Sequence, residues 1–164
     1  VLPGAVHLLA QDRATHMDVW HQAGDAHADV VRDSYADLLD QGVKVSPFID
    51  DMAAAYAWAD LVLCRAGALT VAELAIMGRP AVLVPLPQAI DDHQTANARS
   101  LADRGAAVLL RQDEMTEKSL AEALGSYMAE PQRLVTMAAA ALAAATPDAA
   151  ERVSDCCEEL IHVE

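Results

Sequence analysis

Short apolar runs alternate with longer segments of helical periodicity along most of the chain. Five runs of four residues cover positions 17–20, 43–46, 61–64, 81–84 and 107–110. They are too short and too uniformly apolar for hairpins with one solvated face, so they predict strands of a parallel sheet that is covered on both faces. Between these runs the residue pattern has helical spacing and predicts helices over 26–41, 51–58, 69–77 and 92–104. This alternation is typical of βαβ units and predicts an α/β, Rossmann-like fold.

The two ends of the sequence differ from this alternation. Residues 1–11 have a helical pattern with no strand before them, and the chain after Thr116 is helical to its end. A doubly wound domain normally opens with a strand and a tight phosphate-side loop, so we expect both to lie upstream of Val1. We therefore expect residues 1–164 to form one domain that is incomplete at its N-terminus.

The last helix is amphipathic, and its apolar face must pack on something. That face carries Ala150, Val153, Cys157, Leu160 and Ile161.

Capping residues predict several helix boundaries. Asp50 is suited to cap the helix over 51–58, and Thr116 the helix after it, because short polar side chains accept bonds from free N–H groups in the first turn. Gly78 can supply the left-handed residue that ends the helix over 69–77. Thr146 followed by Pro147 predicts another helix start, with proline at the first helical position.

Charge and cysteine content exclude some functions. Lys and Arg total 11 against 25 Asp and Glu, a net charge of −14. Nucleic-acid binding through a basic surface is therefore not expected. The three cysteines have no disulfide-framework spacing, which favours a reducing compartment. The six histidines form no pair with metal-ligand spacing, so we expect neither a metal site nor a cofactor.

The segment with the most chemical information begins where a buried strand ends, at about Cys64. A turn of small residues follows, and a helix begins near Leu69. Such a turn places free backbone N–H groups and the positive end of a helix at the carboxyl edge of the sheet, where a diphosphate can bind without lysine. Gly67 and Ala68 have small or no side chains and so leave space for the diphosphate, and the Thr70 hydroxyl can add a hydrogen-bond donor.

Glu73 lies one helical turn beyond Thr70. Its carboxylate can accept hydrogen bonds from two neighbouring hydroxyl groups, such as a ribose 2′,3′ pair. In the alternative interpretation Thr70 caps the helix and Glu73 completes a capping box. The motif alone leaves both interpretations open, because small-residue turns between strand and helix are common in this fold class.

Several segments together resemble the MurG family of glycosyltransferases. They follow in order along nearly the whole chain, and four of them at suitable spacing make a specific match. The segments are 20–24 (WHQAG), 48–60 (FIDDMAAAYAWAD), 64–70 (CRAGALT), 92–97 (DHQTAN) and 147–153 (PDAAERV). The family's glycine-rich loop after its first strand is absent, and Ala66 stands where some members carry Ser.

The resemblance implies the C-terminal half of a two-domain, GT-B glycosyltransferase. That half holds the donor, UDP-N-acetylglucosamine, and the N-terminal half, absent here, meets the membrane and the lipid-linked muramoyl-pentapeptide acceptor. The full-length enzyme would be cytoplasmic, peripheral at the inner face of the cell membrane, and would invert the donor's anomeric linkage during peptidoglycan synthesis. The catalytic base would lie outside this sequence, so we assign no catalytic residue.

The resemblance also assigns donor contacts by position. Ile49 would meet the uracil edge through its backbone, and Phe48 and Met52 would flank the ring. Glu73 would hold the ribose.

The remaining donor contacts concern the diphosphate and the sugar. Ala68, Leu69 and Thr70 would sit at the diphosphate beside Gly67. Gln94 and Asn97 would face the sugar hydroxyls.

Other polar and aromatic residues have two interpretations each. Arg65 could face phosphate or form an ion pair such as one with Asp60. His93 could touch the sugar or be solvated. The pair Asp91-Asp92 could perform acid–base chemistry or favour the N-terminus of the following helix. We expect Trp20 and Trp58 to be core residues.

Three functional hypotheses remain at this stage. The first is the donor domain of an N-acetylglucosaminyltransferase. The second is another GT-B transferase or an epimerase that uses a UDP-sugar. The third is a non-enzymatic module that binds a nucleotide or a protein, and self-association through the last helix is compatible with all three.

Overall fold

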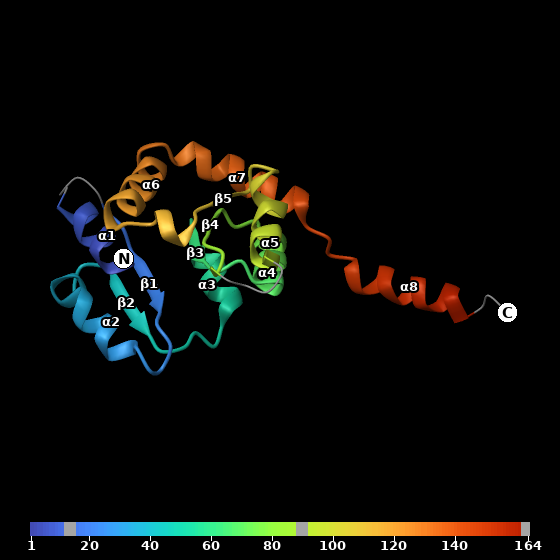
Figure 1. Cartoon of the computed structure of the whole chain (residues 1–164), viewed down its shortest axis with the longest axis horizontal. Coiled ribbons are helices and arrows are strands. Elements are labelled where there is room, and N and C mark those ends of the chain that lie inside the picture. The colour runs from blue at the N-terminus through green and yellow to red at the C-terminus, as the bar shows by residue number, and fades with distance from the viewer. Residues whose placement is uncertain (12–15, 88–91, 162–164) are drawn as a thin grey trace. The chain divides into compact units, whose positions relative to one another are not determined.

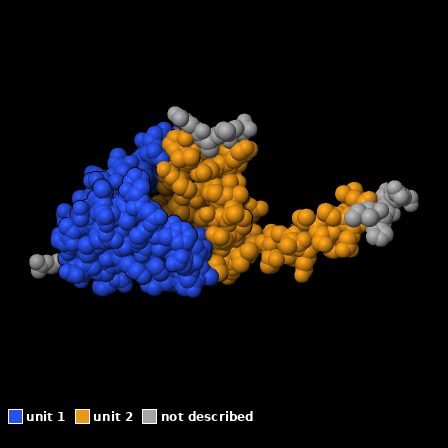
Figure 2. Space-filling model, turned by 90° about the horizontal axis from the view of Figure 1, so that it is seen from below, with its two compact units in different colours: residues 1–59, 110–135 blue, residues 60–109, 136–164 orange. Residues whose placement is uncertain are grey.

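The computed structural model describes residues 1–11, 16–87 and 92–161 (Figure 1). Contacts divide the chain into two compact units, each built from two stretches of sequence and coloured separately in Figure 2. Unit 1 contains residues 1–59 and 110–135, and unit 2 contains residues 60–109 and 136–164. Every strand pairs in parallel with its neighbour. The predicted fold class, parallel strands alternating with helices, is confirmed.

Unit 1 holds the first two strands and the helices around them. Its elements are α1 (Leu2–Ala10), β1 (Val19–Gln22), α2 (Ala28–Tyr35), a 3₁₀ turn (Ala36–Leu38), β2 (Val43–Ser46), α3 (Met52–Trp58), a 3₁₀ turn (Gln112–Glu114), α6 (Glu117–Ala129) and the start of α7 (Pro131–Ala144). β1 and β2 pair from Val19↔Val43 to Gln22↔Ser46. The carboxyl ends of both strands therefore lie at one edge of this ladder.

The core of unit 1 lies between α1, α2 and the two strands. Val6, Tyr35, Leu38 and Val43 form a buried cluster. The Tyr35 hydroxyl lies 3.1 Å from His21 Nδ1. Burial lowers the pKa of His21, since a charged imidazole loses hydration there.

Unit 2 holds a three-stranded ladder in the order β3-β4-β5. Its elements are β3 (Val62–Cys64), α4 (Ala68–Ile76), β4 (Ala81–Leu83), α5 (His93–Ala102), β5 (Ala107–Leu109), the rest of α7, and α8 (Ala149–Ile161). The central strand β4 is buried along its whole length, as the apolar runs predict for a parallel sheet covered on both faces. The five strands in the described residues thus hydrogen-bond as two ladders. The sequence pattern, which does not encode strand neighbours, predicts a single sheet.

Two predicted helix boundaries are confirmed. Gly78 has φ +61° and follows the end of α4, so it supplies the left-handed residue. Thr116 caps α6, and a reciprocal pair of bonds with Ser119 completes a capping box.

Three other boundaries differ from the prediction. The N-cap of α3 is Asp51, whose carboxylate accepts from Ala54 N at 2.9 Å, in place of Asp50. The helix over 26–41 is shorter, because the backbone at Ala36 leaves the right-handed region. α8 begins at Ala149 and not after Thr146, because a turn with a bond from Ala149 N to Thr146 O precedes the helix.

Two tryptophans of unit 1 lie edge to face with ring centroids 6.0 Å apart. Trp20 also donates to Ser46 Oγ at 2.9 Å, and the Lys44 ammonium lies 3.8 Å from the centre of its ring. Trp58 is 51 % exposed. The expectation that Trp58 is a core residue is therefore wrong, since helical spacing alone does not show which side of a short helix faces solvent.

The last helix has no buried residue from Ala149 to Leu160, and Val153 and Leu160 are 64 % and 78 % exposed. Its apolar face therefore lies uncovered. Among the described residues, no helix is both long enough and apolar enough to span a membrane.

Candidate functional site

The turn between β3 and α4 leaves a helix end without a side-chain cap. Gly67 is the N-cap residue, with extended backbone at φ −64° and ψ 145°, and it has no side chain to accept a bond. Val71 N donates to Gly67 O at 2.9 Å, so the helical ladder begins there. The N–H groups of Ala68, Leu69 and Thr70 precede this bond and have no partner within the helix. The first turn of α4 is therefore suited to bind an anion.

The structure excludes the alternative interpretation of Thr70. Thr70 is the third residue inside α4, and the cap is Gly67. The first turn carries no acidic side chain that could occupy the positive end of the helix. Leu69 is 81 % exposed, so the outer side of this turn is open to solvent. These features agree with a turn shaped for a ligand rather than for a capping box.

Glu73 lies near the end of β3. Burial raises the pKa of the Cys64 thiol to about 11, and the negative charge of Glu73 contributes to the same shift. The carboxylate of Glu73 is therefore close enough to Cys64 to act on it, one turn along α4 from the open helix end. Cys64 itself is only partly buried.

Arg65 reaches from the β3–α4 turn to the chain that follows β4. Its Nη1 donates to Val84 O at 3.3 Å and to Pro85 O at 3.2 Å. One terminal nitrogen of the guanidinium carries two N–H bonds and can therefore donate to two carbonyl groups. Arg65 thus connects the segments that follow two neighbouring strands, a role that neither of the two sequence interpretations included.

The first turns of α5 complete this arrangement at the same edge of the ladder. Asn97 Nδ2 donates to Ala66 O at 3.0 Å, and Gln94 Oε1 accepts from Leu86 N at 2.9 Å. The family resemblance predicts that both amides face the sugar. In the structure one end of each amide holds the protein backbone, and Asn97 Oδ1 and Gln94 Nε2 take no part in these two bonds. Asp92 is the N-cap residue of α5, with φ 53° and no side-chain cap bond, and Asp91 lies outside the described residues.

The base-binding residues expected from the sequence lie in unit 1, at the carboxyl end of its ladder. Phe48 is 65 % exposed, while the side chain of Ile49 is buried. Met52 is the first residue of α3 and is half-buried. The segment is held at both ends, because Gly24 N donates to Pro47 O at 2.9 Å and Asp51 caps α3. An exposed aromatic ring on an anchored segment is suited to stack on a planar ligand.

Sequence reasoning assigned no role to Gln22, the last residue of β1. Its Oε1 accepts a hydrogen bond from Ile49 N at 2.9 Å. The signal was present in the order of elements, because parallel strands bring the residues that follow β1 and β2 to the same edge.

The ten expected donor-binding residues therefore divide between the units. Phe48, Ile49 and Met52 belong to unit 1. Unit 2 holds Gly67, Ala68, Leu69, Thr70, Glu73, Gln94 and Asn97. Within unit 2 the hydrogen bond from Asn97 Nδ2 to Ala66 O connects the β3–α4 turn to α5.

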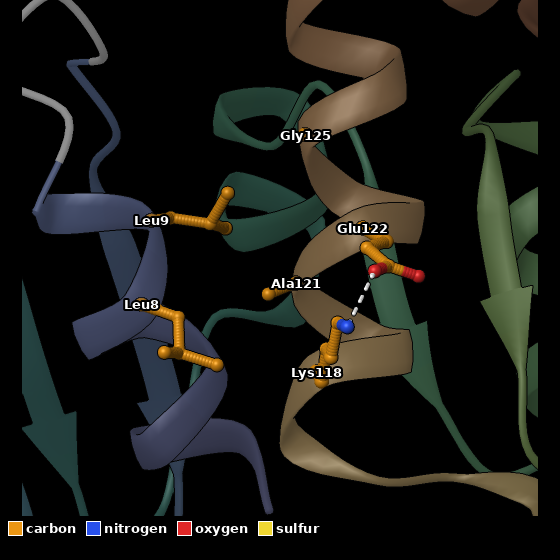
Figure 3. A pocket seen from close by; sticks show the side chains of 6 residues that line it. All are labelled: Leu8, Leu9, Lys118, Ala121, Glu122 and Gly125. Atoms are coloured by element: carbon orange, nitrogen blue, oxygen red, sulfur yellow. Dashed lines mark ion pairs between the residues drawn. The ribbon is translucent and has the colours of Figure 1, made fainter.

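A separate groove in unit 1 lies between α1 and α6 (Figure 3). Leu8, Leu9 and Ala121 give it an apolar lining, and Lys118 and Glu122 form an ion pair of 3.8 Å on α6. None of the expected donor-binding residues lines this groove.

Comparison with known proteins places these features in a family. The family described as "Glycosyltransferase family 28 C-terminal domain" matches residues 2–153. The chain is 53 % identical over 155 residues to a protein of Tolumonas auensis, and 54 % identical over 147 residues to one of Stutzerimonas stutzeri. Both relatives are named UDP-N-acetylglucosamine--N-acetylmuramyl-(pentapeptide) pyrophosphoryl-undecaprenol N-acetylglucosamine transferase. The alignments cover 94 % and 88 % of this chain but only 43 % and 40 % of those proteins.

Solved structures give the same result for the fold. The crystal structure of Acinetobacter baumannii MurG superposes with a TM-score of 0.87 at 43 % identity, over 96 % of this chain and 44 % of that protein. The glycosyltransferase VinC in complex with dTDP superposes with a TM-score of 0.66 at 21 % identity, over 99 % of this chain and 37 % of that one. The second similarity shows the fold alone.

Proposed function

This chain belongs to the glycosyltransferase family 28 C-terminal domain family, and from that membership we propose that it binds the sugar donor of an N-acetylglucosaminyltransferase. The donor is UDP-N-acetylglucosamine, and the acceptor is the undecaprenyl-diphosphate-linked muramoyl pentapeptide. The chain spans about two fifths of the length of the curated relatives it matches. Transfer to the acceptor therefore belongs to a longer protein, in which this domain supplies the donor site.

The observation that carries the proposal is the uncapped first turn of α4. Its three free N–H groups offer donors to a diphosphate at the end of a helix dipole. With a net charge of −14, the protein needs a local device of this kind to attract an anion. Glu73, one turn further along, then faces the ribose, and its carboxylate accepts from the 2′ and 3′ hydroxyl groups.

The proposed contacts to the base belong to unit 1 and the proposed contacts to the sugar belong to unit 2. The Ile49 backbone reads the uracil edge, and Phe48 covers the ring. Gln94 and Asn97 present an amide N–H₂ and an amide oxygen to the sugar hydroxyls, because their other ends hold backbone groups.

The reaction inverts the anomeric configuration, from an α-linked donor to a β-linked product. A base must take the proton of the acceptor's C4 hydroxyl while the departing UDP is stabilised. In this proposal the domain contributes the second of these functions through the N-terminus of α4. The base and the acceptor site lie in the other half of the enzyme, which works peripherally at the inner face of the membrane.

The experiment is donor binding by Glu73→Ala, measured by calorimetry in the full-length protein. The substitution removes the acceptor of two charge-assisted hydrogen bonds and should weaken binding of UDP-N-acetylglucosamine by about 1.5–3 kcal/mol. Binding of the 2′,3′-dideoxyribose analogue should be nearly indifferent to it. Equal losses for the two donors would contradict the ribose assignment. ATP that binds as tightly as UDP would instead favour a general nucleotide-binding module.

A further inference from the structure

The Gln22 side chain accepts a hydrogen bond from the same backbone N–H that the proposed function assigns to the base. The Ile49 N–H is the donor that reads uracil in the proposed site, and in this structure it donates to Gln22 Oε1 at 2.9 Å. One N–H cannot make two full hydrogen bonds in the same direction. A uracil carbonyl that takes this donor must therefore displace the Gln22 side chain.

The carboxamide of Gln22 has the same donor and acceptor pattern as the base. A primary amide presents a carbonyl oxygen with an N–H beside it, as uracil does at O4 and N3. Cytosine presents the reverse pattern at that edge. Gln22 therefore satisfies the Ile49 N–H with the same kind of group that the ligand would supply.

The local structure allows the exchange. Ile49 is held in place by its buried side chain and by the Asp51 cap of α3, so the N–H direction is fixed. Gln22 is exposed and belongs to the end of β1, where its side chain can turn into solvent. The Gln22 backbone stays anchored, because Gln22 pairs with Ser46 in the ladder. Displacement thus moves one side chain and leaves the backbone unchanged.

We propose that Gln22 is a specificity-determining residue whose side-chain amide occupies the base-reading N–H of Ile49 in the free protein and is displaced by uracil. This inference rests on the proposed function. It gives Gln22 two consequences for binding. In the free protein the Ile49 N–H is paired with Gln22, and a ligand that lacks the amide-like edge cannot replace the bond that it breaks. Gln22 therefore favours uracil over bases with the reversed pattern.

The test compares Gln22→Met and Gln22→Glu in the full-length protein by calorimetry with UDP. Methionine has similar length but no strong acceptor, so nothing competes with the base, and UDP should bind about two- to tenfold more tightly. Glutamate accepts the N–H more strongly as a charged group, so UDP should bind more weakly than to the unmodified protein. Gln41→Met is the matched control, because the Gln41 side chain bonds only to Asp37 O one turn away.

The two variants are expected to change UDP affinity in opposite directions, and this distinguishes displacement of Gln22 from a structural role. Weaker UDP binding by both variants would show that Gln22 supports the segment or contacts the base. Unchanged UDP binding by both would show that Gln22 does not compete with the base. Either result overturns the inference. Hydrogen exchange of the Ile49 amide gives a second measurement, which should be slow in the unmodified protein, fast in free Gln22→Met and slow again when UDP is added. Failure of the unmodified protein to bind UDP would refute the proposed function itself, before any variant is compared.

Discussion

Gly67→Ala should separate ligand binding from folding. Gly67 precedes α4 with φ −64° and ψ 145°, a conformation open to any residue. A Cβ at this position would meet only the Thr70 hydroxyl, at an ordinary contact distance of 3.7 Å. The fold of the free protein therefore does not require glycine here. A diphosphate at the first-turn N–H groups of α4 would, however, meet the added methyl group.

The size of the two effects follows from these observations. Alanine is a poorer N-cap residue than glycine, which costs up to about 1 kcal/mol. It also lowers the entropy of the unfolded chain, which contributes about 0.4–1 kcal/mol in the other direction. The free energy of unfolding should thus stay within about 1 kcal/mol of the unmodified value. Loss of one charge-assisted bond to the diphosphate should weaken UDP binding by about 1.5–3 kcal/mol.

Gly78→Ala is the matched control, because it should have the opposite effects. Gly78 has φ +61°, and an added Cβ would lie 2.6 Å from Leu142 Cγ. The left-handed backbone should cost about 1–2 kcal/mol of the free energy of unfolding. Leu142 is 56 % exposed and can turn away, so the contact adds little. UDP affinity should be unchanged.

Urea denaturation and UDP calorimetry on both variants give the four required values. If Gly67→Ala binds UDP as tightly as the unmodified protein does, the diphosphate does not approach Gly67 and the assignment of the first turn of α4 is wrong. If Gly67→Ala unfolds as easily as Gly78→Ala does, glycine at this position serves the fold, and the reasoning from its open surroundings fails.

The other predictions concern three side chains and the last helix. Asn97→Asp replaces the amide donor to the β3–α4 turn with a carboxylate, so UDP should bind about tenfold more weakly or worse while uridine binding changes little; calorimetry with both ligands checks this. Cys64, with its pKa raised to about 11, should react with iodoacetamide far more slowly at pH 8 than the two exposed cysteines of α8, which peptide mass mapping over time would show. Because the pKa of His21 is lowered on folding, its stabilising effect is present above the unfolded pKa of about 6.5 and is lost as pH falls below it. The difference in unfolding free energy between the unmodified protein and His21→Gln should therefore shrink from pH 7.5 to pH 5, and a constant difference would contradict this. Truncation after Ala145 should leave the ladders folded and reduce any self-association in sedimentation, whereas global unfolding would show that α8 belongs to the core.

Much of the fold follows from local sequence signals. The apolar runs locate the five described strands to within two residues. The reason is clearest for β4, which is buried at every position and is therefore apolar throughout. Gly78 and Thr116 mark their boundaries correctly, since each has a conformational or hydrogen-bonding role that few other residues can fill. Asp50 and Asp51 show the limit of this reasoning. Both can cap a helix, and only the backbone path decides which carboxylate faces the free N–H groups.

The site is predictable in part for the same reason. The strand–turn–helix motif around Gly67 is local, so its open helix end could be expected from the sequence. The bond between Gln22 and Ile49 joins residues 27 positions apart, and it depends on which strands are neighbours. The backbone contacts of Arg65 likewise cross from one strand end to the next. Periodicity describes each segment by itself and does not contain these pairings.

The cation-free first turn of α4 has a consequence for the rate at which a nucleotide arrives. A diphosphate that approaches a protein of net charge −14 is repelled at long range, while the helix dipole acts only within the last few ångströms. Dissolved salt screens the first interaction more than the second, because the Debye length is about 10 Å at 0.1 M. Added salt should therefore speed association and change dissociation little, the reverse of its effect on sites that attract phosphate with clusters of lysine and arginine.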